Sequence, residues 1–399
     1  MRVNSNKDIH KTKRDPYKLL IRLTIILAAV VAVGYGTFYL CTQAVHSDYY
    51  AKRAQVEELN AQGQQEFDAK LNALRTSANA QLDPTTGEIT QGTLEAWEKT
   101  LGSQTWRVED QGRAALENTS EVSLDRSALL YGGMLLINQW HMMPADYTSH
   151  EDQLVSIGNA SSWKVQVNDG NVRVYPNAYD ALLQMVEDAG AEKLTSYIVQ
   201  EAYRTNDEQV TLFNAQMETL SGKYSGDTLI EQTKKKVNYP GTSEYQSGLS
   251  FKMKLYSKTD TALNRAGFQT TEQGKWFTEN CWKYGVIFRF PTQDFPDASW
   301  EDKSYKTGVT LEMSLYRYVG KAHAAAMRVL GYCLEEYVEF LQDHPHLYVY
   351  EDGSLKYEVY RIAVDDTQQS FTVPVPNPAN GYTASFDNLG GIVLAYAYN

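Results

Sequence analysis

The spacing of apolar residues changes along the chain from helical to strand-like. Between Pro176 and Gly190 they recur at intervals of three and four, as on the buried face of a helix. From Phe251 to Leu255 they alternate with lysines, as along a half-buried strand. The same reasoning predicts further elements, namely helices over 271–284 and 321–342 and strands over 196–203, 286–290, 309–318, 370–375 and 391–398. The body of the protein is therefore predicted to be of the α+β class.

A longer apolar run extends from Leu23 to Cys41, and its 19 positions contain no charged residue. This length is sufficient for a helix to cross the core of a bilayer, and the apolar residues surround the helix instead of following one face. Cations gather on its N-terminal side, so the positive-inside rule places the N-terminus in the cytoplasm and the rest of the chain outside. No small-residue cleavage pattern follows, which favours an uncleaved single-pass anchor over a cleaved signal peptide.

Charge separates the N-terminal part from the rest of the chain. The 399 residues carry 37 Lys and Arg against 49 Asp and Glu, a formal net charge of -12. Seven of the cations and only two of the anions lie within residues 1–41, so the remainder is more acidic than the whole. An acidic body is repelled by a phosphate backbone, which argues against nucleic acid as a partner.

Composition also divides the exported part. Residues 47–82 are rich in Ala, Gln, Glu and Lys, which predicts a solvated helical stalk closed by Asp83-Pro84. Near the C-terminus, Asp352-Gly353 stands between two alternating runs and predicts a hairpin. The predicted organisation is a cytoplasmic basic tail (1–22), a transmembrane anchor (23–41), an exported helical stalk and linker (42–120), a globular domain (121–343) and a small β-rich appendage (344–399).

Three cysteines do not make a disulfide framework. Cys41 belongs to the apolar run, which leaves Cys281 and Cys333 as the exported pair. The sequence does not decide whether these two meet. Our default interpretation is that both are buried and act as small hydrophobic residues.

Two segments carry candidate chemistry. Thr205 is followed three residues later by Glu208, a capping box that predicts the start of a helix. The segment Tyr239 to Leu255 leads a loop into the alternating strand. Such a junction suits a functional site, because the loop can bend side chains inward while the strand fixes their direction.

These segments resemble the VanY-type D-alanyl-D-alanine metallocarboxypeptidases over residues 129–341. The matching motifs are Tyr203-Arg204 with Gln209, Ser243-Glu244 with Gln246, Gly248-Leu249, the spaced residues from Trp276 to Pro291, and Glu312 with Arg317 to Gly320. The resemblance implies a small antiparallel sheet flanked by helices. It also implies a general base and a set of substrate-binding residues, which are Glu312 for the first and Arg204, Gln209, Ser243, Gln246 and Tyr318 for the second.

The family's three zinc ligands are replaced in this chain. Where the family has His, Asp and His, this sequence has Tyr245, Lys252 and Leu315. Leucine has no donor atom, and a lysine at neutral pH is a cation that repels a metal ion. None of the seven histidines forms a His-x-x-x-His pair that could take over. We therefore expect no metal and no cofactor.

Without a metal-bound water, Glu312 has no obvious nucleophile to activate. We hypothesise that Lys252 occupies the former metal region and pairs with Glu312; in the alternative, Lys252 points to solvent. The substrate-binding residues either still hold a peptide carboxylate, as Arg204 could without zinc, or persist as packing and hydrogen-bond supports.

Three functions follow from these observations. The leading prediction is a membrane-anchored, exported cell-envelope protein with an inactive carboxypeptidase-like domain, which binds peptidoglycan stem peptide or a protein partner. The second is an active D,D-carboxypeptidase that trims stem peptides with a relocated metal. The third is a purely structural protein of envelope assembly.

Overall fold

The structure is a computed structural model that describes residues 25–27, 29–37, 39, 65, 69, 106–147, 151–309, 311–377 and 379–398. The chain divides into two compact units, residues 1–58 and 59–399. In the first unit, residues 25–27 and 29–37 are helical, and none of the described helices is long and apolar enough to cross a membrane. The predicted tail and, apart from residues 65 and 69, the predicted stalk up to residue 105 lie outside the described residues.

A five-stranded sheet in the order β4-β6-β7-β9-β8 organises the middle of the chain. All neighbouring pairs are antiparallel except β4 with β6. The strands are β4 (Gln166–Val167), β6 (Tyr197–Glu201), β7 (Ser250–Leu255), β8 (Val286–Phe288) and β9 (Leu315–Tyr318). The alternation predicted for β7 is confirmed, because Phe251, Met253 and Leu255 are buried while the lysines between them are partly exposed.

Two helices pack with this sheet in one hydrophobic core. α5 (Pro176–Ala191) begins with a proline at its first position and buries Leu182 and Met185. α8 (Glu272–Asn280) begins after Thr271, whose hydroxyl accepts a hydrogen bond from the Gly274 amide, and continues into the 3-10 turn η5 (Cys281–Tyr284). The helices predicted over 176–190 and 271–284 are therefore confirmed.

The strand predicted over 309–318 is shorter than expected. Only Leu315–Tyr318 pair as β9, and the described residues just before them are irregular. The Glu312 carboxylate turns back to accept a hydrogen bond from the Ser314 amide at 3.4 Å, which bends the chain at this point. Glu312 therefore lies on a loop at the entrance to the sheet.

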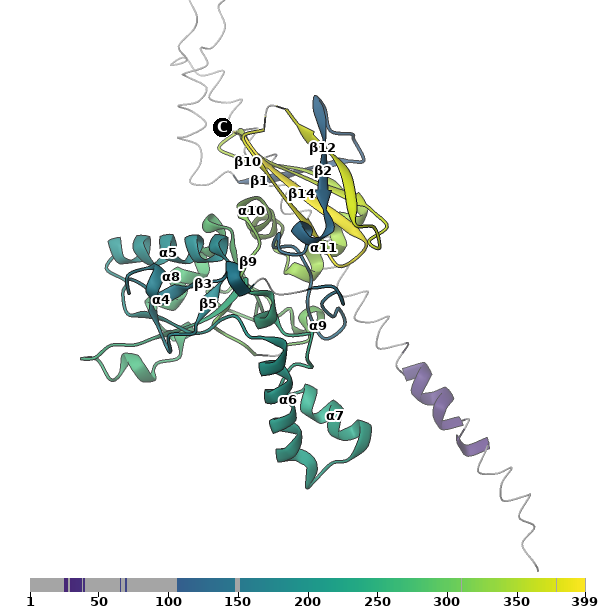
Figure 1. Ribbon diagram of the computed structural model, residues 1–399, viewed down its shortest axis with the longest axis vertical. Coiled ribbons are helices and arrows are strands. Elements are labelled where there is room, and N and C mark those ends of the chain that lie inside the picture. The colour runs from purple at the N-terminus through teal and green to yellow at the C-terminus, as the bar shows by residue number, and fades with distance from the viewer. Residues whose placement is uncertain are drawn as a thin grey trace, which may run out of the picture. The chain divides into compact units, whose positions relative to one another are not determined.

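A helical hairpin of α6 (Asn206–Ser221) and α7 (Gly226–Lys234) projects from the body (Figure 1). The predicted capping box is present at its start. The Thr205 hydroxyl accepts from the Glu208 amide at 3.1 Å, and the Glu208 carboxylate accepts from the Thr205 amide at 2.7 Å. Between the base of the hairpin and the body, the Phe213 and Tyr239 rings meet edge to face with centroids 5.2 Å apart.

Replacing Thr205 tests whether the capping box stabilises α6. Thr205→Ala removes the acceptor of the Glu208 amide, so we expect the free energy of unfolding in urea to fall by about 1 kcal/mol. Thr219→Ala, in the last turn of the same helix, is the matched control and should change it by less than about 0.5 kcal/mol. Equal stabilities for the two variants would contradict the capping role.

A second five-stranded sheet, β1-β10-β11-β14-β13, is antiparallel throughout. Its strands are β1 (Arg107–Gly112), β10 (His346–Glu351), β11 (Ser354–Ala363), β13 (Tyr382–Phe386) and β14 (Gly391–Ala397), and beside it β2 (Thr119–Asp125) pairs with β12 (Ser370–Pro376). Asp352 and Gly353, both at positive φ, make the turn between β10 and β11. The predicted hairpin is therefore confirmed.

The single helix predicted over 321–342 is two helices, α10 (Lys321–Leu330) and α11 (Leu334–Asp343). Gly331 ends α10 with φ of 68°, a left-handed conformation that glycine adopts without strain. Cys333 then caps α11. Both Cys281 and Cys333 are buried and free, as the default interpretation expected.

The predicted domain boundaries do not separate independent cores. β1 and the start of β2 come from the predicted linker, yet they pair with strands of the predicted appendage. Residues of α10 and α11 share one hydrophobic core with β10, β11 and β14. The body therefore includes residues from 106 onward, and the C-terminal strands are an integral part of it.

Short elements complete the described fold. They are α3 (Arg126–Leu129), α4 (Ile157–Ala160), α9 (Ser304–Thr307), β3 (Val155–Ser156), β5 (Arg173–Val174), η1 (Glu151–Gln153), η2 (Glu244–Ser247), η3 (Leu263–Arg265) and η4 (Phe268–Thr270).

Candidate functional site

A pocket of about 560 Å³ opens where the loop before β7 meets the loop before β9. Its lining also includes the C-terminal end of α7 and the segment 137–142. Four of the residues singled out from the sequence lie in this lining: Ser243, Tyr245, Glu312 and Leu315. A pocket of this size is typical of small-ligand and peptide sites, which makes it the candidate functional site.

The sheet places three side chains in a row beside the pocket. Glu201 on β6 is the register partner of Lys252 on β7, and Lys252 is the partner of Leu315 on β9. Residues directly opposite each other on neighbouring strands point to the same face of a sheet. The sequence-predicted pair Lys252 and Leu315 is therefore brought together, with Glu201 beside it.

Lys252 and Glu312 form an ion pair, which confirms the hypothesis drawn from the sequence. The Lys252 Nζ donates to Glu312 Oε2 at 2.7 Å, and the two side chains are 26% and 22% exposed. Glu312 lines the pocket, so the ammonium neutralises a carboxylate that would otherwise face the cavity alone. The positive charge beside Glu312 is therefore the ammonium group of Lys252.

Arg204 lies next to Glu201, and its guanidinium group already has partners within the protein. Its guanidinium donates to the carboxylate of Glu201 and to Gln209 Oε1, and it lies over the Tyr245 ring at 4.6 Å from the centroid. Gln209 is fully buried and donates its amide to the Asn238 carbonyl at 2.6 Å. Arg204 and Gln209 therefore brace the wall of the pocket formed by Tyr245.

The three remaining predicted binding residues differ in their surroundings. The Gln246 side chain accepts from the Gly241 amide at 2.8 Å and donates to Asn206 at 3.2 Å, so it links the loop before β7 to the start of α6. Tyr318 packs against the core of the first sheet and is outside the pocket lining. Ser243 is buried and lines the pocket.

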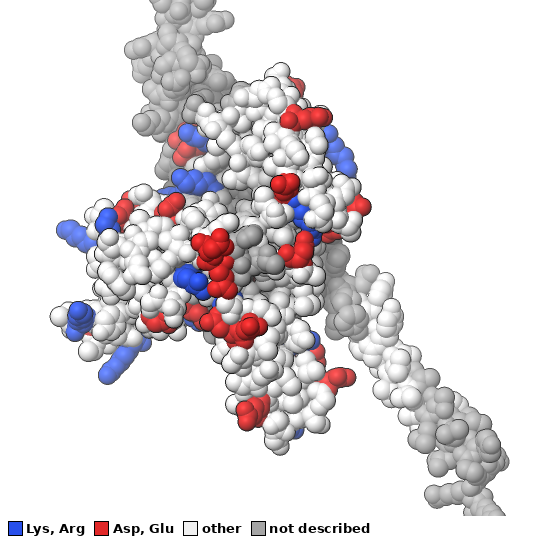
Figure 2. Space-filling view, viewed as in Figure 1, with Lys and Arg blue, Asp and Glu red and all other residues white. Residues whose placement is uncertain are grey.

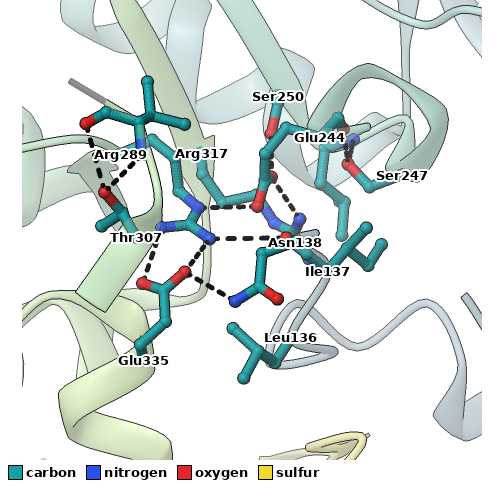
Figure 3. Close-up of polar contacts among 12 residues, drawn as sticks. Leu136, Ile137, Asn138, Glu244, Ser247, Ser250, Arg289, Thr307, Arg317 and Glu335 are labelled. Atoms are coloured by element: carbon teal, nitrogen blue, oxygen red, sulfur yellow. Dashed lines mark hydrogen bonds and ion pairs between the residues drawn. The ribbon is translucent and has the colours of Figure 1, made fainter. Parts of the chain in front are cut away.

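A buried network of charges holds the loop that carries Tyr245 (Figure 3). Glu244 accepts from Arg289 Nε at 2.6 Å and from Arg317 Nη1 at 2.7 Å, and the Ser250 hydroxyl donates to it at 2.9 Å. Arg289 also binds Glu335 on α11 through two nitrogens, at 2.9 and 2.7 Å. Two cations and two anions thus balance in the interior, as buried charges require.

The network determines the charge state of Glu244. Burial alone would raise the pKa of this carboxyl, but the adjacent Arg289 and Arg317 outweigh burial and lower the pKa to about 2. Glu244 is therefore ionised at every pH at which the protein is expected to work. Glu244 belongs to the loop before β7 and also lines the pocket. Its ion pairs with the two arginines therefore hold this loop in place at the pocket wall.

The comparisons with known proteins agree with this geometry. Residues 171–321 match the family described as VanY, D-alanyl-D-alanine carboxypeptidase. The span contains the loop before β7, the ion pair and the row across the three strands. These residues form a domain of the VanY D-alanyl-D-alanine carboxypeptidase family.

Relatives of the VanY-type domain match longer stretches of the chain. A D-alanyl-D-alanine carboxypeptidase of Enterococcus faecium is 28% identical over 283 residues, which is 70% of this chain and 79% of that protein. One from Enterococcus faecalis (strain ATCC 700802 / V583) is 28% identical over 56% of this chain and 71% of that protein. Among solved structures, the vancomycin resistance D,D-dipeptidase VanXYg, in complex with a D-Ala-D-Ala phosphinate analog, matches with a TM-score of 0.53 and 22% identity. That match covers 70% of this chain and 99% of the other, and it shows a common fold.

The donor set of this VanY-type domain does not fit zinc. Burial, with the Glu201 and Glu312 carboxylates nearby, raises the pKa of Tyr245 and keeps its phenol neutral. Leu315 has no donor, and Lys252 is committed to Glu312. Within the described part of the chain, no group of three or more His, Cys, Asp or Glu residues is arranged to hold a metal ion.

Sequence reasoning missed two residues of the VanY-type site. The sequence predicts only a strand at Glu201, which pairs with Arg204 and lies opposite Lys252. It predicts only a helix at Glu335, which neutralises Arg289. The available signal for Glu201 was a carboxylate at the end of the strand, three residues before Arg204. No local signal marks Glu335, since its partner is distant in the sequence.

Proposed function

We propose that this chain is a membrane-anchored, exported cell-envelope protein whose VanY-type domain binds peptide without cleaving it. Its ligand is a peptidoglycan stem peptide or a segment of a protein partner. The observation that carries the proposal is the Lys252–Glu312 ion pair at 2.7 Å, on the sheet face where Leu315 replaces a ligand of the family. A loss of catalysis with a retained pocket is the simplest explanation of both the ion pair and the replaced ligand.

The chemistry of the pocket supports binding over hydrolysis. A general base must accept a proton from a nearby water, whereas one Glu312 oxygen accepts from Lys252 and the other from the Ser314 amide. The pocket meanwhile keeps the features that bind: a volume of about 560 Å³, a buried polar Ser243 and a wall fixed by the Glu244 network. These residues can orient a peptide but do not provide a nucleophile.

Membrane anchoring rests on the sequence. The uncharged run from Leu23 to Cys41 follows a cationic segment, which orients the chain with its N-terminus in the cytoplasm and its VanY-type domain on the cell-wall side. An exported position would bring the pocket within reach of peptidoglycan peptides and of other envelope proteins.

An active D,D-carboxypeptidase is the second candidate, favoured by the similarity to the carboxypeptidases of the two Enterococcus species. The test is to incubate the purified full-length chain with excess zinc and an acyl-D-Ala-D-Ala peptide. We expect no D-alanine release above buffer and less than about 0.1 zinc per chain after dialysis, because three donors are required. An active enzyme of the family is the positive control.

Turnover together with stoichiometric zinc would overturn the proposal in favour of an active enzyme. Absence of both activity and peptide binding would instead favour the third function, a structural protein of envelope assembly. Isothermal titration with acyl-D-Ala-D-Ala peptides and with partner-derived peptides separates the last two outcomes.

A further inference from the structure

The end of α7 gives the pocket an excess of positive charge. Lys234, Lys235 and Lys236 all contribute to the lining. Of these, Lys234 pairs with Glu231 at 2.7 Å, so it is neutralised within the lining. Lys235 and Lys236 are exposed, and neither ammonium group has a hydrogen bond or ion pair with the residues that the structure describes.

The anions of the lining are all matched by other cations. Glu312 is paired with Lys252 and Glu244 with two arginines. The two free lysines are therefore a surplus of positive charge on a chain whose net charge is -12. Figure 2 shows acidic side chains gathered near the middle of the face it presents. A local surplus of this kind attracts an anionic ligand.

Large apolar side chains lie exposed around the same opening. Met142, Tyr239 and Leu311 line the pocket with exposed fractions of 52%, 41% and 71%. Trp140 is 57% exposed, and its ring lies against Gly308, where an added Cβ would come within 3.0 Å of it. Gly308 is itself part of the lining. Single exposed apolar residues are common, but four around one pocket indicate a surface that is covered in a complex.

We propose that the mouth of this pocket binds an acidic segment of a partner protein that carries bulky apolar side chains. Carboxylates of that segment would pair with Lys235 and Lys236, and its apolar side chains would cover the rim of Trp140, Met142, Tyr239 and Leu311. This inference rests on the proposed function, because it assumes a pocket that binds without cleaving. It selects a protein partner over a stem peptide, since the methyl side chains of alanine are too small to cover such a rim.

The test is a selection from a library of random peptides displayed on phage, with the full-length chain as bait. We expect the peptides selected by the natural sequence to be enriched in Asp or Glu together with Leu, Phe, Trp or Met. The variant Lys235→Glu/Lys236→Glu should select peptides enriched in Lys or Arg instead. A synthetic peptide selected on the natural sequence should bind this variant at least about tenfold more weakly in a fluorescence titration.

The matched control is Lys258→Glu/Lys275→Glu, which makes the same charge change at two exposed lysines outside the pocket lining. It should leave both the selected composition and the affinity unchanged. A second variant, Leu311→Ser, should reduce the apolar enrichment while keeping the acidic one.

Three results would overturn the inference. The first is a selection without acidic enrichment, and the second is an enrichment that Lys235→Glu/Lys236→Glu does not alter. The third is binding of a D-Ala-D-Ala stem pentapeptide that is unaffected by this variant and displaces the selected peptides, in which case the pocket binds wall peptide and the proposed function still holds. Zinc-dependent release of D-alanine is the separate result that would remove the proposed function itself.

Discussion

The variant Tyr245→His/Lys252→Asp/Leu315→His is expected to bind one zinc ion per chain, with a dissociation constant of about 1 µM or tighter, equivalent to about 8 kcal/mol. Lys252 and Leu315 are register partners on adjacent strands, and Tyr245 and Leu315 line the same pocket. The three substitutions therefore introduce two imidazoles and a carboxylate on one wall, a donor set that zinc accepts. Competition with a chromogenic chelator measures the affinity.

The controls for this variant distinguish the effect of adding metal ligands from the effect of removing the Lys252 charge. Lys252→Met/Leu315→Met removes the ammonium without adding ligands, so it should bind no more zinc than the natural sequence. Each single histidine variant should bind at least about 100-fold more weakly than the triple variant, because it supplies one ligand beside a repelling lysine. A triple variant that folds, as judged by circular dichroism, and binds no zinc would show that the scaffold of the metal site has changed as well.

Glu244→Gln is expected to lower the free energy of unfolding by about 3–5 kcal/mol, measured by urea denaturation at pH 7. The substitution keeps the size of the side chain but leaves two fully buried guanidinium groups, Arg289 and Arg317, with only Glu335 as counter-charge. Glu218→Gln, an exposed carboxylate on α6, is the matched control and should change stability by less than about 0.5 kcal/mol.

The pH dependence of unfolding provides a second readout of Glu244. Its pKa is lowered in the folded protein to about 2 from an ordinary value of 4.5. A lowered pKa stabilises the folded state above the unfolded pKa, and this stabilisation is lost as pH falls from about 4.5 towards 2. The difference corresponds to about 3 kcal/mol, which the natural sequence should lose over that range and Glu244→Gln should not. An identical loss of stability in both proteins over this pH range would contradict the assignment of the lowered pKa to Glu244.

The local elements of this protein were predictable from sequence, because they follow from spacing and caps. The helix at 176–190 and the turn at Asp352-Gly353 came from patterns within a few residues. The pairing of Lys252 with Glu312 was also anticipated, because the resemblance placed the two at one former metal site.

Long-range pairings were not predictable in the same way. No local pattern indicates that Arg289 and Glu335 form a pair, and only the folded structure shows that Arg289, just after β8, meets Glu335 on α11. The lysines at the end of α7 were not singled out for the same reason, since their position at the pocket depends on how the hairpin docks. Strand order was also difficult to predict, because β1 lies in a stretch whose pattern of apolar and polar residues is weak.

The pairing of the first strands with the last ones has a consequence for biosynthesis. β1 and β2 leave the ribosome long before β10 and β12, which are their hydrogen-bonding partners. A chain emerging from its N-terminus must keep two unsatisfied strand edges from aggregating until β10 and β12 have been made. A nascent chain that stopped after α11 would contain every residue of the pocket lining, yet it would lack the strands that complete the core around α10 and α11 and would expose both edges.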